Sequence, residues 1–237
     1  DAAVAAGFSP DGQMLLTGHV SGALRRWNAV TGAAIGQPWR TGAEAIEAVA
    51  YSVDGRWVAA AAAGRILYFD AASGRAGPTI TGPTLTVRPS VTRLLVDTER
   101  GHIVTGHLSG LLQLWDARTG AWTDLSEAGV EHGAPVNSLA LSPDGSLVAS
   151  GGEDGVVLVF GTQGLDAPVA RMKDHRAGVT QVAFSQDGQR LLSASSDRTL
   201  RVWEAERWSA LDEPYEGHKD VVHAAAFSAD GLRIVSV

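Results

Sequence analysis

Residues 175–203 read HRAGVTQVAFSQDGQRLLSASSDRTLRVW, a stretch in which short apolar runs alternate with polar turns. The runs Val179–Phe184, Arg190–Ser195 and Thr199–Trp203 are rich in valine, leucine and aromatic residues, and a fourth run follows at Trp208–Leu211. None of these runs has the length or the 3.6-residue period of an ordinary helix. Short runs of this composition, bounded by Asp-Gly and Ser-Asp turns, are typical of β-strands. The stretch therefore predicts four short antiparallel strands.

The same pattern recurs along the whole chain. A turn containing Asp-Gly, with one degenerate copy, ends at intervals of 43–46 residues on Gly12, Gly55, Gly101, Gly145, Gly188 and Gly231. An aromatic residue follows in each of the first five copies, at intervals of 42–46 residues, at Trp27, Phe69, Trp115, Phe160 and Trp203. Four short strands in every 40–45 residues are the repeating unit of a β-propeller, in which stacked blades bury one another's faces.

We therefore predict an all-β protein, a β-propeller of four-stranded antiparallel blades with about five and a half blades present. The expected blades, within a single domain, are 1–36, 45–80, 90–125, 135–170, 178–212 and a partial blade at 221–237. Because the sixth blade stops on its second strand, we expect a fragment of a longer chain that forms a six- or seven-bladed ring. An unpaired strand edge favours pairing with another chain, so association through the half blade is a further expectation.

Polar residues recur at fixed positions within the repeats. His175, Ser193, Asp197 and Trp203 follow one another at intervals of 18, 4 and 6 residues. The preceding copy repeats these intervals with His132, Ser150 and Asp154, but has Phe160 in place of the tryptophan. Partial sets occur as Thr17 with Trp27, Thr105 with Trp115, and His218 with Ser236. The second copy has lost the set and carries Ala59, Ala63 and Phe69.

These residues and intervals resemble the WD-repeat β-propeller family over essentially the whole chain. The resemblance implies a buried structural tetrad, in which Trp203 donates to Ser193, Ser193 to His175, and His175 to Asp197. The alternative is a catalytic His-Ser-Asp triad. The trio recurs in several copies, whereas an active site is single, and the chain has no G-x-S-x-G nucleophile elbow. We therefore expect no catalytic residues.

The histidines also raise the question of a metal site. His132, His175 and His218 are each 43 residues apart, which places them in successive blades. Histidines in successive blades are too far apart to share one ion, because metal ligands lie about 2 Å from it. We therefore expect no metal site. Phosphate-binding motifs are absent from the sequence, and we expect no cofactor. His19 and His107 are interpreted as turn-side surface residues, and Arg25-Arg26 as part of a solvated strand edge.

The resemblance implies a non-catalytic protein–protein interaction scaffold. Contacts in this family usually involve the loops before each first strand and between the second and third strands. The candidate interaction residues in these loops are Arg40, Glu153, Arg176, Ser196, Lys219 and Asp220. The net charge of −7 disfavours nucleic acid and anionic membranes as partners. With no visible signal peptide and no apolar run of about 18 residues, we expect a cytoplasmic protein.

Three functions remain open at this point. The linkers at residues 29–38 and 71–78 resemble those of bacterial WD-repeat proteins from high-GC organisms, where the propeller is often a sensor attached to a signalling domain. A binding module of such a protein, with a covalently attached effector domain, is therefore the favoured interpretation. The alternatives are a stand-alone assembly scaffold and a propeller enzyme. An enzyme would need polar side chains on the first strands, where Asn137 and His223 are exceptions in a small, apolar pattern.

Overall fold

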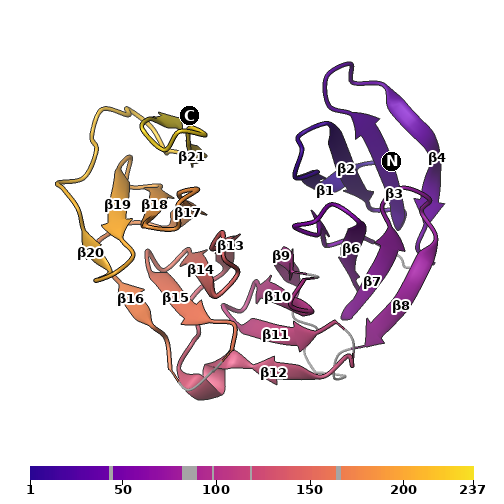
Figure 1. Cartoon of the computed structure of the whole chain (residues 1–237), viewed down its shortest axis with the longest axis horizontal. Coiled ribbons are helices and arrows are strands. Elements are labelled where there is room, and N and C mark those ends of the chain that lie inside the picture. Colours follow the sequence, from indigo (N-terminus) through magenta and orange to yellow (C-terminus); the bar gives the residue numbers. More distant parts are fainter. Residues whose placement is uncertain (43–44, 82–89, 98, 118, 164–166) are drawn as a thin grey trace. The chain divides into compact units, whose positions relative to one another are not determined.

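The computed structural model describes residues 1–42, 45–81, 90–97, 99–117, 119–163 and 167–237. Five four-stranded antiparallel sheets and one two-stranded sheet make up this part of the chain (Figure 1). In every sheet the order of the strands follows the chain, because each strand pairs with the next one through a short connection. The predicted all-β fold of propeller blades is thereby confirmed.

The blades are numbered in chain order. Blade 1 contains β1 (Ala3–Phe8), β2 (Met14–His19), β3 (Ala23–Asn28) and β4 (Ala34–Arg40). Blade 2 contains β5 (Ala48–Tyr51), β6 (Trp57–Ala62), β7 (Arg65–Asp70) and β8 (Ala76–Thr81). Blade 3 contains β9 (Val91–Asp97), β10 (His102–His107), β11 (Leu112–Asp116) and β12 (Trp122–Asp124), and is followed by the 3-10 turn η1 (Leu125–Ala128).

The remaining blades follow the same scheme. Blade 4 contains β13 (Val136–Leu141), β14 (Leu147–Gly152), β15 (Val157–Gly161) and β16 (Ala170–Met172). Blade 5 contains β17 (Val179–Phe184), β18 (Arg190–Ser195), β19 (Leu200–Glu204) and β20 (Ser209–Ala210). Blade 6 is the two-stranded sheet of β21 (Ala225–Phe227) and β22 (Ile234–Ser236). Within the described residues, no helix has the length and apolar character needed to cross a bilayer.

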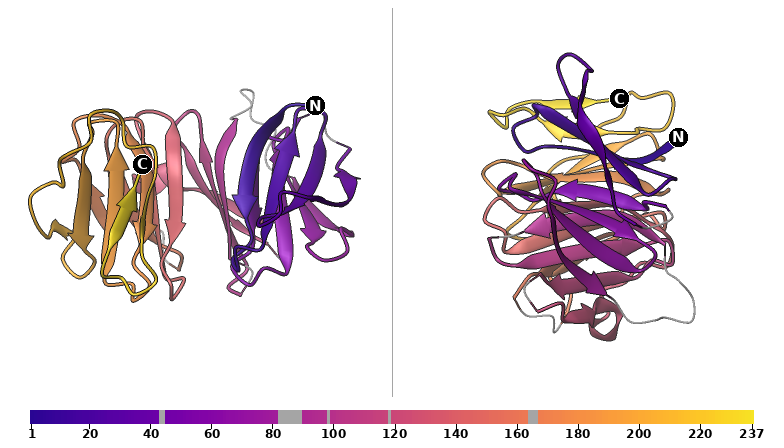
Figure 2. Two further views of the ribbon diagram at one scale, coloured as in Figure 1. Left: turned by 90° about the horizontal axis from the view of Figure 1, so that it is seen from above. Right: turned by 90° about the vertical axis from the view of Figure 1, so that its right-hand side faces the viewer.

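The chain divides into two compact units. The first comprises Asp1–Thr105 and Gln113–Thr123, and the second comprises Gly106–Leu112 and Asp124–Val237. Within each unit, the first strands of consecutive blades contact one another: β1 with β5, β5 with β9, β13 with β17, and β17 with β21. The strands of the second unit run alongside one another in the left view of Figure 2, and the connecting loops gather at the two ends of the strands.

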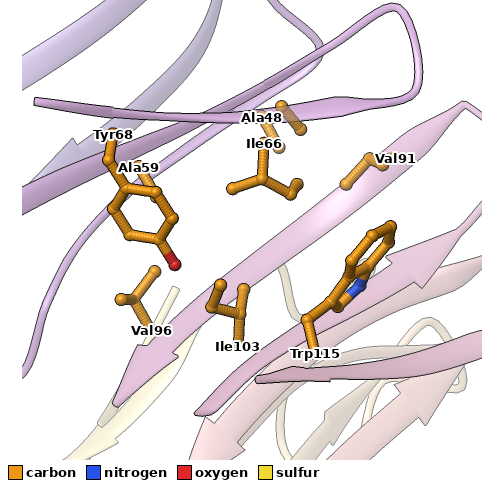
Figure 3. Close-up of a cluster of buried hydrophobic side chains, with 9 residues drawn as sticks. Ala48, Ala59, Ile66, Tyr68, Val91, Val96, Ile103 and Trp115 are labelled. Carbon is orange, nitrogen blue, oxygen red and sulfur yellow. The ribbon is translucent and has the colours of Figure 1, made fainter. Parts of the chain in front are cut away.

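Apolar faces of consecutive blades form the cores. In the first unit, Tyr68 of β7 and Trp115 of β11 lie in one buried cluster with Ile66 and Ile103, between blades 2 and 3 (Figure 3). In the second unit, Trp203 of β19 is buried in a cluster with residues of blades 4 and 5. Burying one such large side chain contributes about 1.5–3 kcal/mol. Stacking of blades therefore supplies the apolar burial that a single four-stranded sheet cannot provide.

Neighbouring blades approach so closely that one position on the second strand has no room for a side chain. A Cβ atom placed on Gly151 of β14 would lie 2.5 Å from Cγ1 of Val179, on the first strand of blade 5. At the equivalent position of blade 1, a Cβ atom on Gly18 would collide with the side chain of Ile46. Glycine at these positions therefore allows the branched residue of the next blade to fill the space.

Arg26 forms a polar link between blades 1 and 2. Its Nη1 donates to the carbonyl oxygens of Ala71 at 3.2 Å and Ala72 at 3.1 Å. The guanidinium carbon also lies 4.4 Å from the centroid of the Trp39 ring, a cation–π contact. The interpretation of Arg26 as a solvated edge residue is therefore wrong, because its head group crosses to the next blade.

Candidate functional site

Blade 5 contains a chain of hydrogen bonds that runs from its core to its surface loop. The Trp203 indole Nε1 donates to Ser193 Oγ at 2.9 Å, and Ser193 Oγ lies 2.8 Å from His175 Nε2. His175 Nδ1 lies 2.9 Å from Asp197 Oδ2, which also accepts from the backbone N–H of Arg176 at 2.9 Å. Ser193 has no exposed surface, and Trp203 is 1% exposed. The loop before β17 is thus tied to the core of the blade.

The direction of each bond follows from the chemistry of the groups. The indole N–H of Trp203 can only donate and an ionised carboxylate can only accept, so the Ser193 oxygen accepts and His175 Nδ1 carries a proton. Burial lowers the pKa of His175 despite the neighbouring Asp197 carboxylate, so the imidazole is neutral near pH 7. His175 Nε2 then accepts a hydrogen bond from the Ser193 hydroxyl. Every member of this group has a partner.

Asp197 holds the loop between β18 and β19 as well. Its Oδ1 accepts from the Thr199 hydroxyl at 2.7 Å and from the Thr199 backbone N–H at 3.0 Å. Burial alone raises the pKa of Asp197, but the hydrogen bonds from Thr199 and Arg176 outweigh it and lower the pKa well below the ordinary value. The carboxylate is therefore charged, with both oxygens occupied.

Blade 4 repeats the arrangement without its indole. His132 Nε2 lies 2.9 Å from Ser150 Oγ, and His132 Nδ1 lies 3.0 Å from Asp154 Oδ1. Phe160, 1% exposed, occupies the position of the tryptophan and offers no donor. In blade 6, His218 Nε2 lies 2.7 Å from Ser236 Oγ. The histidine–hydroxyl contact is thus common to blades 4, 5 and 6.

Blade 1 builds the contact from a different histidine. The Trp27 indole donates to Thr17 Oγ1 at 2.8 Å, and Thr17 Oγ1 lies 2.9 Å from Nε2 of His19. His19 Nδ1 lies 3.2 Å from the backbone carbonyl of Asp1, whose carboxylate accepts from the Ser21 hydroxyl at 2.5 Å. Thr17 and His19 are two residues apart on β2 and therefore project from the same face of the sheet.

The interpretation of His19 and His107 as surface residues is wrong. His19 is 5% exposed and His107, at the equivalent position of blade 3, is 2% exposed. In blade 3 the Trp115 indole donates to Thr105 Oγ1 at 3.0 Å. One signal in the sequence pointed to these histidines: Thr-Gly-His occurs in the two copies that have serine, Ser21 or Ser109, in place of aspartate.

Blade 2 replaces the polar group with apolar packing. Ala59 has no exposed surface and lies in the cluster with Tyr68, while Phe69 lies in the adjoining cluster and stacks on Trp39 with ring centroids 5.8 Å apart. The carboxylate of Glu47 accepts from the backbone N–H groups of Ala63 at 3.2 Å and Val91 at 2.8 Å. Glu47 therefore joins the loop of blade 2 to the start of blade 3.

The six candidate interaction residues lie on loops or strand ends. Arg40 ends β4 in the first unit, and the other five lie in the second unit. Five are exposed and Ser196 is half-buried, in the set Arg40, Glu153, Arg176, Ser196, Lys219 and Asp220. The five residues of the second unit lie on the loops of blades 4 to 6.

These five residues are chain neighbours of the buried polar groups. Arg176 follows His175, Ser196 precedes Asp197, and Lys219 and Asp220 follow His218. Glu153 precedes Asp154, and its carboxylate accepts from Asn137 Nδ2 at 2.6 Å. The backbone that carries the exposed charges is therefore fixed from inside the blades.

The geometry offers little for catalysis or metal binding. A nucleophile must reach its substrate, whereas Ser193 and Ser150 have no exposed surface. In the part of the chain that the structure describes, no group of three or more His, Asp or Glu side chains could hold a metal ion. The histidines of successive blades each bond within their own blade.

A family model described as "WD domain, G-beta repeat" matches residues 127–160 and 166–204, which include blade 4 up to Phe160, its fourth strand, and the first three strands of blade 5. These two segments of the chain match the WD40 repeat. WD40 repeat proteins generally act as protein-interaction scaffolds and are typically non-catalytic. The two matched repeats are those in which histidine, serine and aspartate bond in the order described above.

Partial similarity also extends to eukaryotic translation initiation factor 3 subunit I. The chain is 33% identical over 63 residues to this protein from Drosophila grimshawi, which covers 27% of the chain and 19% of the relative. To the protein from Drosophila mojavensis it is 28% identical over 96 residues, covering 40% of the chain and 29% of the relative. The chain thus spans less than a third of the curated relatives it matches. These insect proteins do not support the bacterial origin expected from the linkers.

Proposed function

We propose that this chain is a non-catalytic protein-interaction scaffold whose second unit presents a binding face on the loops of blades 4 to 6. The observation that carries the proposal is the bond from the Arg176 backbone N–H to Asp197 Oδ2 at 2.9 Å. It fixes an exposed loop to a buried hydrogen-bonded group. A surface held in one conformation before binding loses less entropy when a partner docks. The WD40 repeats and the subunit names of the relatives support the same function.

The buried serines argue against the enzyme alternative, because no substrate can reach a hydroxyl that has no exposed surface. The narrower proposal, a sensor module of a larger bacterial signalling protein, rests on the resemblance of the linkers. A stand-alone scaffold uses the same surface and differs in what is attached to it. We also propose that the chain forms a single domain, that its partners are proteins and that it is located in the cytoplasm.

A charge exchange within the face tests the scaffold function. The double variant Glu153→Arg/Arg176→Glu reverses two exposed charges without changing the net charge. The matched control Glu206→Arg/Arg207→Glu does the same on the exposed turn after β19. Proteins cross-linked to each version in cells of the source organism are quantified by mass spectrometry. We expect the amount of each specific cross-linked partner to fall at least tenfold with the first variant and to stay unchanged with the control. Equal recovery with both variants would exclude this face as the binding surface.

A further inference from the structure

The first unit has a cavity of about 390 Å³ between blades 1 and 2, beside the Asp-Gly turns of both blades. Its lining combines apolar and polar side chains and includes Pro10, Met14, Arg26, Tyr51, Asp11 and Asp54. Pockets for small organic molecules enclose about 300–1,000 Å³ and combine apolar walls with a few polar groups. The cavity has the size and the mixed lining of such a pocket.

Arg26 and Tyr51 distinguish this cavity from the equivalent places in the other blades. Arg26 precedes the aromatic residue of the third strand, a position that blades 2 to 5 fill with the uncharged residues Tyr68, Leu114, Val159 and Val202. Tyr51 precedes the Ser-x-Asp-Gly turn, and the other copies of this turn follow Phe8, Leu141, Phe184 and Phe227. The guanidinium and the hydroxyl are therefore not needed to form a blade.

The equivalent places in the second unit are filled by apolar side chains. Between blades 4 and 5, Val159 lies in a buried cluster against which Phe184 packs, and Trp208 stands edge-on to Phe184 with ring centroids 6.5 Å apart. Between blades 5 and 6, Val202 lies in a buried cluster against which Phe227 packs. The place between blades 1 and 2 thus has hydrogen-bonding groups where the second unit has apolar contacts.

The two distinguishing side chains each carry a buried atom that has no hydrogen-bond partner among the described residues. These atoms are Nε of Arg26 and the hydroxyl oxygen of Tyr51. Burial raises the pKa of Tyr51, although the charge of Arg26 lowers it in part, so the hydroxyl keeps its proton. An N–H group and an O–H group therefore both lack an acceptor. Leaving buried donors unpaired is costly, so a ligand that fills the cavity and supplies an acceptor removes that cost.

The carboxylate of Asp11 offers the opposite chemistry. It accepts from the Ser9 hydroxyl at 2.5 Å and from the Gln13 backbone N–H at 3.0 Å, and both of these bonds reach the same oxygen, Oδ1. Oδ2 of Asp11 can therefore accept from a ligand. The hydrogen bond from Ser9 lowers the pKa of Asp11, so the carboxylate is charged at neutral pH. The cavity thus has an acceptor as well as two donors.

The charges of the lining decide between kinds of ligand. Arg26 carries one positive charge, whereas Asp11 and Asp54 carry two negative charges, so the cavity disfavours an anion. An ammonium group has donors alone and cannot accept from Tyr51 or Arg26. An uncharged primary carboxamide has a carbonyl oxygen with two lone pairs and an NH₂ group with two donors. It is therefore the group that matches both kinds of partner.

We propose that this cavity binds a ligand through a primary carboxamide group, whose carbonyl oxygen accepts from Tyr51 and Arg26 and whose NH₂ group donates to Asp11. The remainder of the ligand lies against the apolar part of the lining, at Pro10 and Met14. Small organic amides and glutamine side chains both carry this group. The site belongs to the first unit and is independent of the interaction face proposed for the second.

The probes are 4-fluorobenzamide, 4-fluorobenzoate and 4-fluorobenzamidine, three molecules of nearly equal shape, titrated with the 237-residue chain at pH 7 and followed by fluorine NMR. The amide is uncharged, the benzoate is an anion with acceptors alone, and the amidine is a cation with donors alone. We expect the amide to bind at least tenfold tighter than either charged probe. Equal binding of the three, tighter binding of a charged probe, or no binding of the amide would overturn the proposal.

A hydroxyl deletion tests the predicted contact directly. Tyr51→Phe installs the residue that blades 1, 5 and 6 have at this position and keeps the ring. We expect it to weaken amide binding about tenfold, the loss of one hydrogen bond, and to leave amidine binding unchanged. The control Tyr215→Phe removes a hydroxyl from a side chain that is 47% exposed in the second unit and should have no effect. Equal amide binding by the two variants would overturn the contact and the site with it.

A second variant blocks the cavity without altering its hydrogen-bonding side chains. Ala72 is exposed and belongs to the lining, so Ala72→Leu should reduce amide binding by steric exclusion. Thermal unfolding verifies that each variant is folded, and Ala72→Leu decides alone if Tyr51→Phe does not fold. Unchanged amide binding by Ala72→Leu would place the amide elsewhere and overturn the proposal.

Two peptide pools, degenerate around a central glutamine or a central methionine, identify the source of the amide. Methionine has a similar length but no amide. Tighter binding of the glutamine pool, sensitive to Tyr51→Phe, would assign the group to a partner protein. Equal and weak binding of both pools, together with binding of 4-fluorobenzamide, would assign it to a small molecule. Both results support the carboxamide site, whereas tighter binding of the methionine pool would overturn it.

Discussion

His19 Nε2 lies 2.9 Å from Oγ1 of Thr17, which stands two residues earlier on the same face of β2. In blade 5 the equivalent imidazole, His175, reaches Ser193 at 2.8 Å from a position 18 residues earlier in the chain. Both histidines contact a hydroxyl that accepts the indole N–H of a tryptophan. The hydroxyl between indole and imidazole is therefore the constant feature, and the blades differ in where the imidazole comes from.

The first prediction concerns this alternative histidine. We expect His19→Ala to lower the free energy of unfolding by about 1–3 kcal/mol, because it removes the partner of the Thr17 hydroxyl and leaves a gap in a buried site. Val20→Ala is the control, since Val20 is 51% exposed and such substitutions usually change stability by less than about 0.5 kcal/mol. Urea denaturation compares the two variants. Equal effects would mean that the His19 contact does not stabilise blade 1.

The second prediction is a loss of stability in mild acid. Burial lowers the pKa of His19, His132 and His175 in the folded chain below the ordinary 6.5. The unfolded chain then binds more protons than the folded chain below pH 6.5. The contribution of these histidines to the free energy of unfolding is therefore fully present above this pH and decreases as the pH falls below it. Each unit of difference in pKa corresponds to about 1.4 kcal/mol.

Carboxylates add a second step at lower pH. Although burial raises the pKa of Asp154 and Asp197, hydrogen bonds outweigh it and lower both values below 3.8. Their stabilisation is present above pH 3.8 and is lost as the pH falls further. Denaturation curves between pH 8 and 3 measure the histidine step and the onset of the carboxylate step. The variant His175→Gln should flatten the dependence between pH 6.5 and 5, whereas the exposed-site control His223→Gln should retain the steeper slope of the unmodified chain.

The repeat could be predicted from sequence because two independent series of residues, the turn glycines and the aromatic residues of the third strands, have the same period. The bonds among His175, Ser193, Asp197 and Trp203 follow the intervals for the same reason: equal spacing in equal blades places equal atoms together. The contact of His19 with Thr17 was missed because residues two apart on a strand give no long-range interval. Their contact depends on side-chain projection and on the position of Asp1, which only the structure shows.

Arg26 and Arg198 show a second limit of sequence reasoning. The link from Arg26 to Ala71 and Ala72 depends on how one blade stacks on the next, and no local pattern encodes that arrangement. The left-handed φ of Arg198 cannot be predicted from blade 5 alone. It can be predicted from the glycines that occupy the equivalent turn position in blades 1 to 4, Gly22, Gly64, Gly110 and Gly155, which have the same conformation. Comparing the blades position by position reveals the exception.

The third prediction tests the close contact between blades 4 and 5. We expect Gly151→Ala to destabilise the chain by about 1–3 kcal/mol, because the new Cβ atom would lie 2.5 Å from Val179 Cγ1 and would force the blades apart. Gly133→Ala is the control, since its Cβ atom would meet nothing nearer than the Asp154 carboxylate at 3.9 Å. Thermal unfolding of the two variants measures the difference. A similar melting temperature for both would show that the interface adapts without cost.

The last prediction separates the roles of the hydroxyl and the indole in blade 5. Ser193→Ala leaves two buried groups without partners, the Trp203 N–H and His175 Nε2, and should cost about 2–5 kcal/mol. Trp203→Phe should cost less, about 1–2 kcal/mol, because Ser193 keeps His175 as its partner and the loss is one hydrogen bond and some packing. Blade 4 has this arrangement naturally, with Phe160 beside a histidine–serine contact of 2.9 Å.

The double variant Ser193→Ala/Trp203→Phe completes a thermodynamic cycle. Once the indole is gone, removing the hydroxyl leaves a single unpartnered group, His175 Nε2, so the double variant should cost less than the sum of the single variants. Chemical denaturation measures the coupling, which we expect to be about 0.5–3 kcal/mol, the range for residues in one hydrogen-bonded network. Additive effects would mean that the indole and the hydroxyl stabilise blade 5 independently. In that case the 2.9 Å contact between Trp203 Nε1 and Ser193 Oγ would contribute to packing alone.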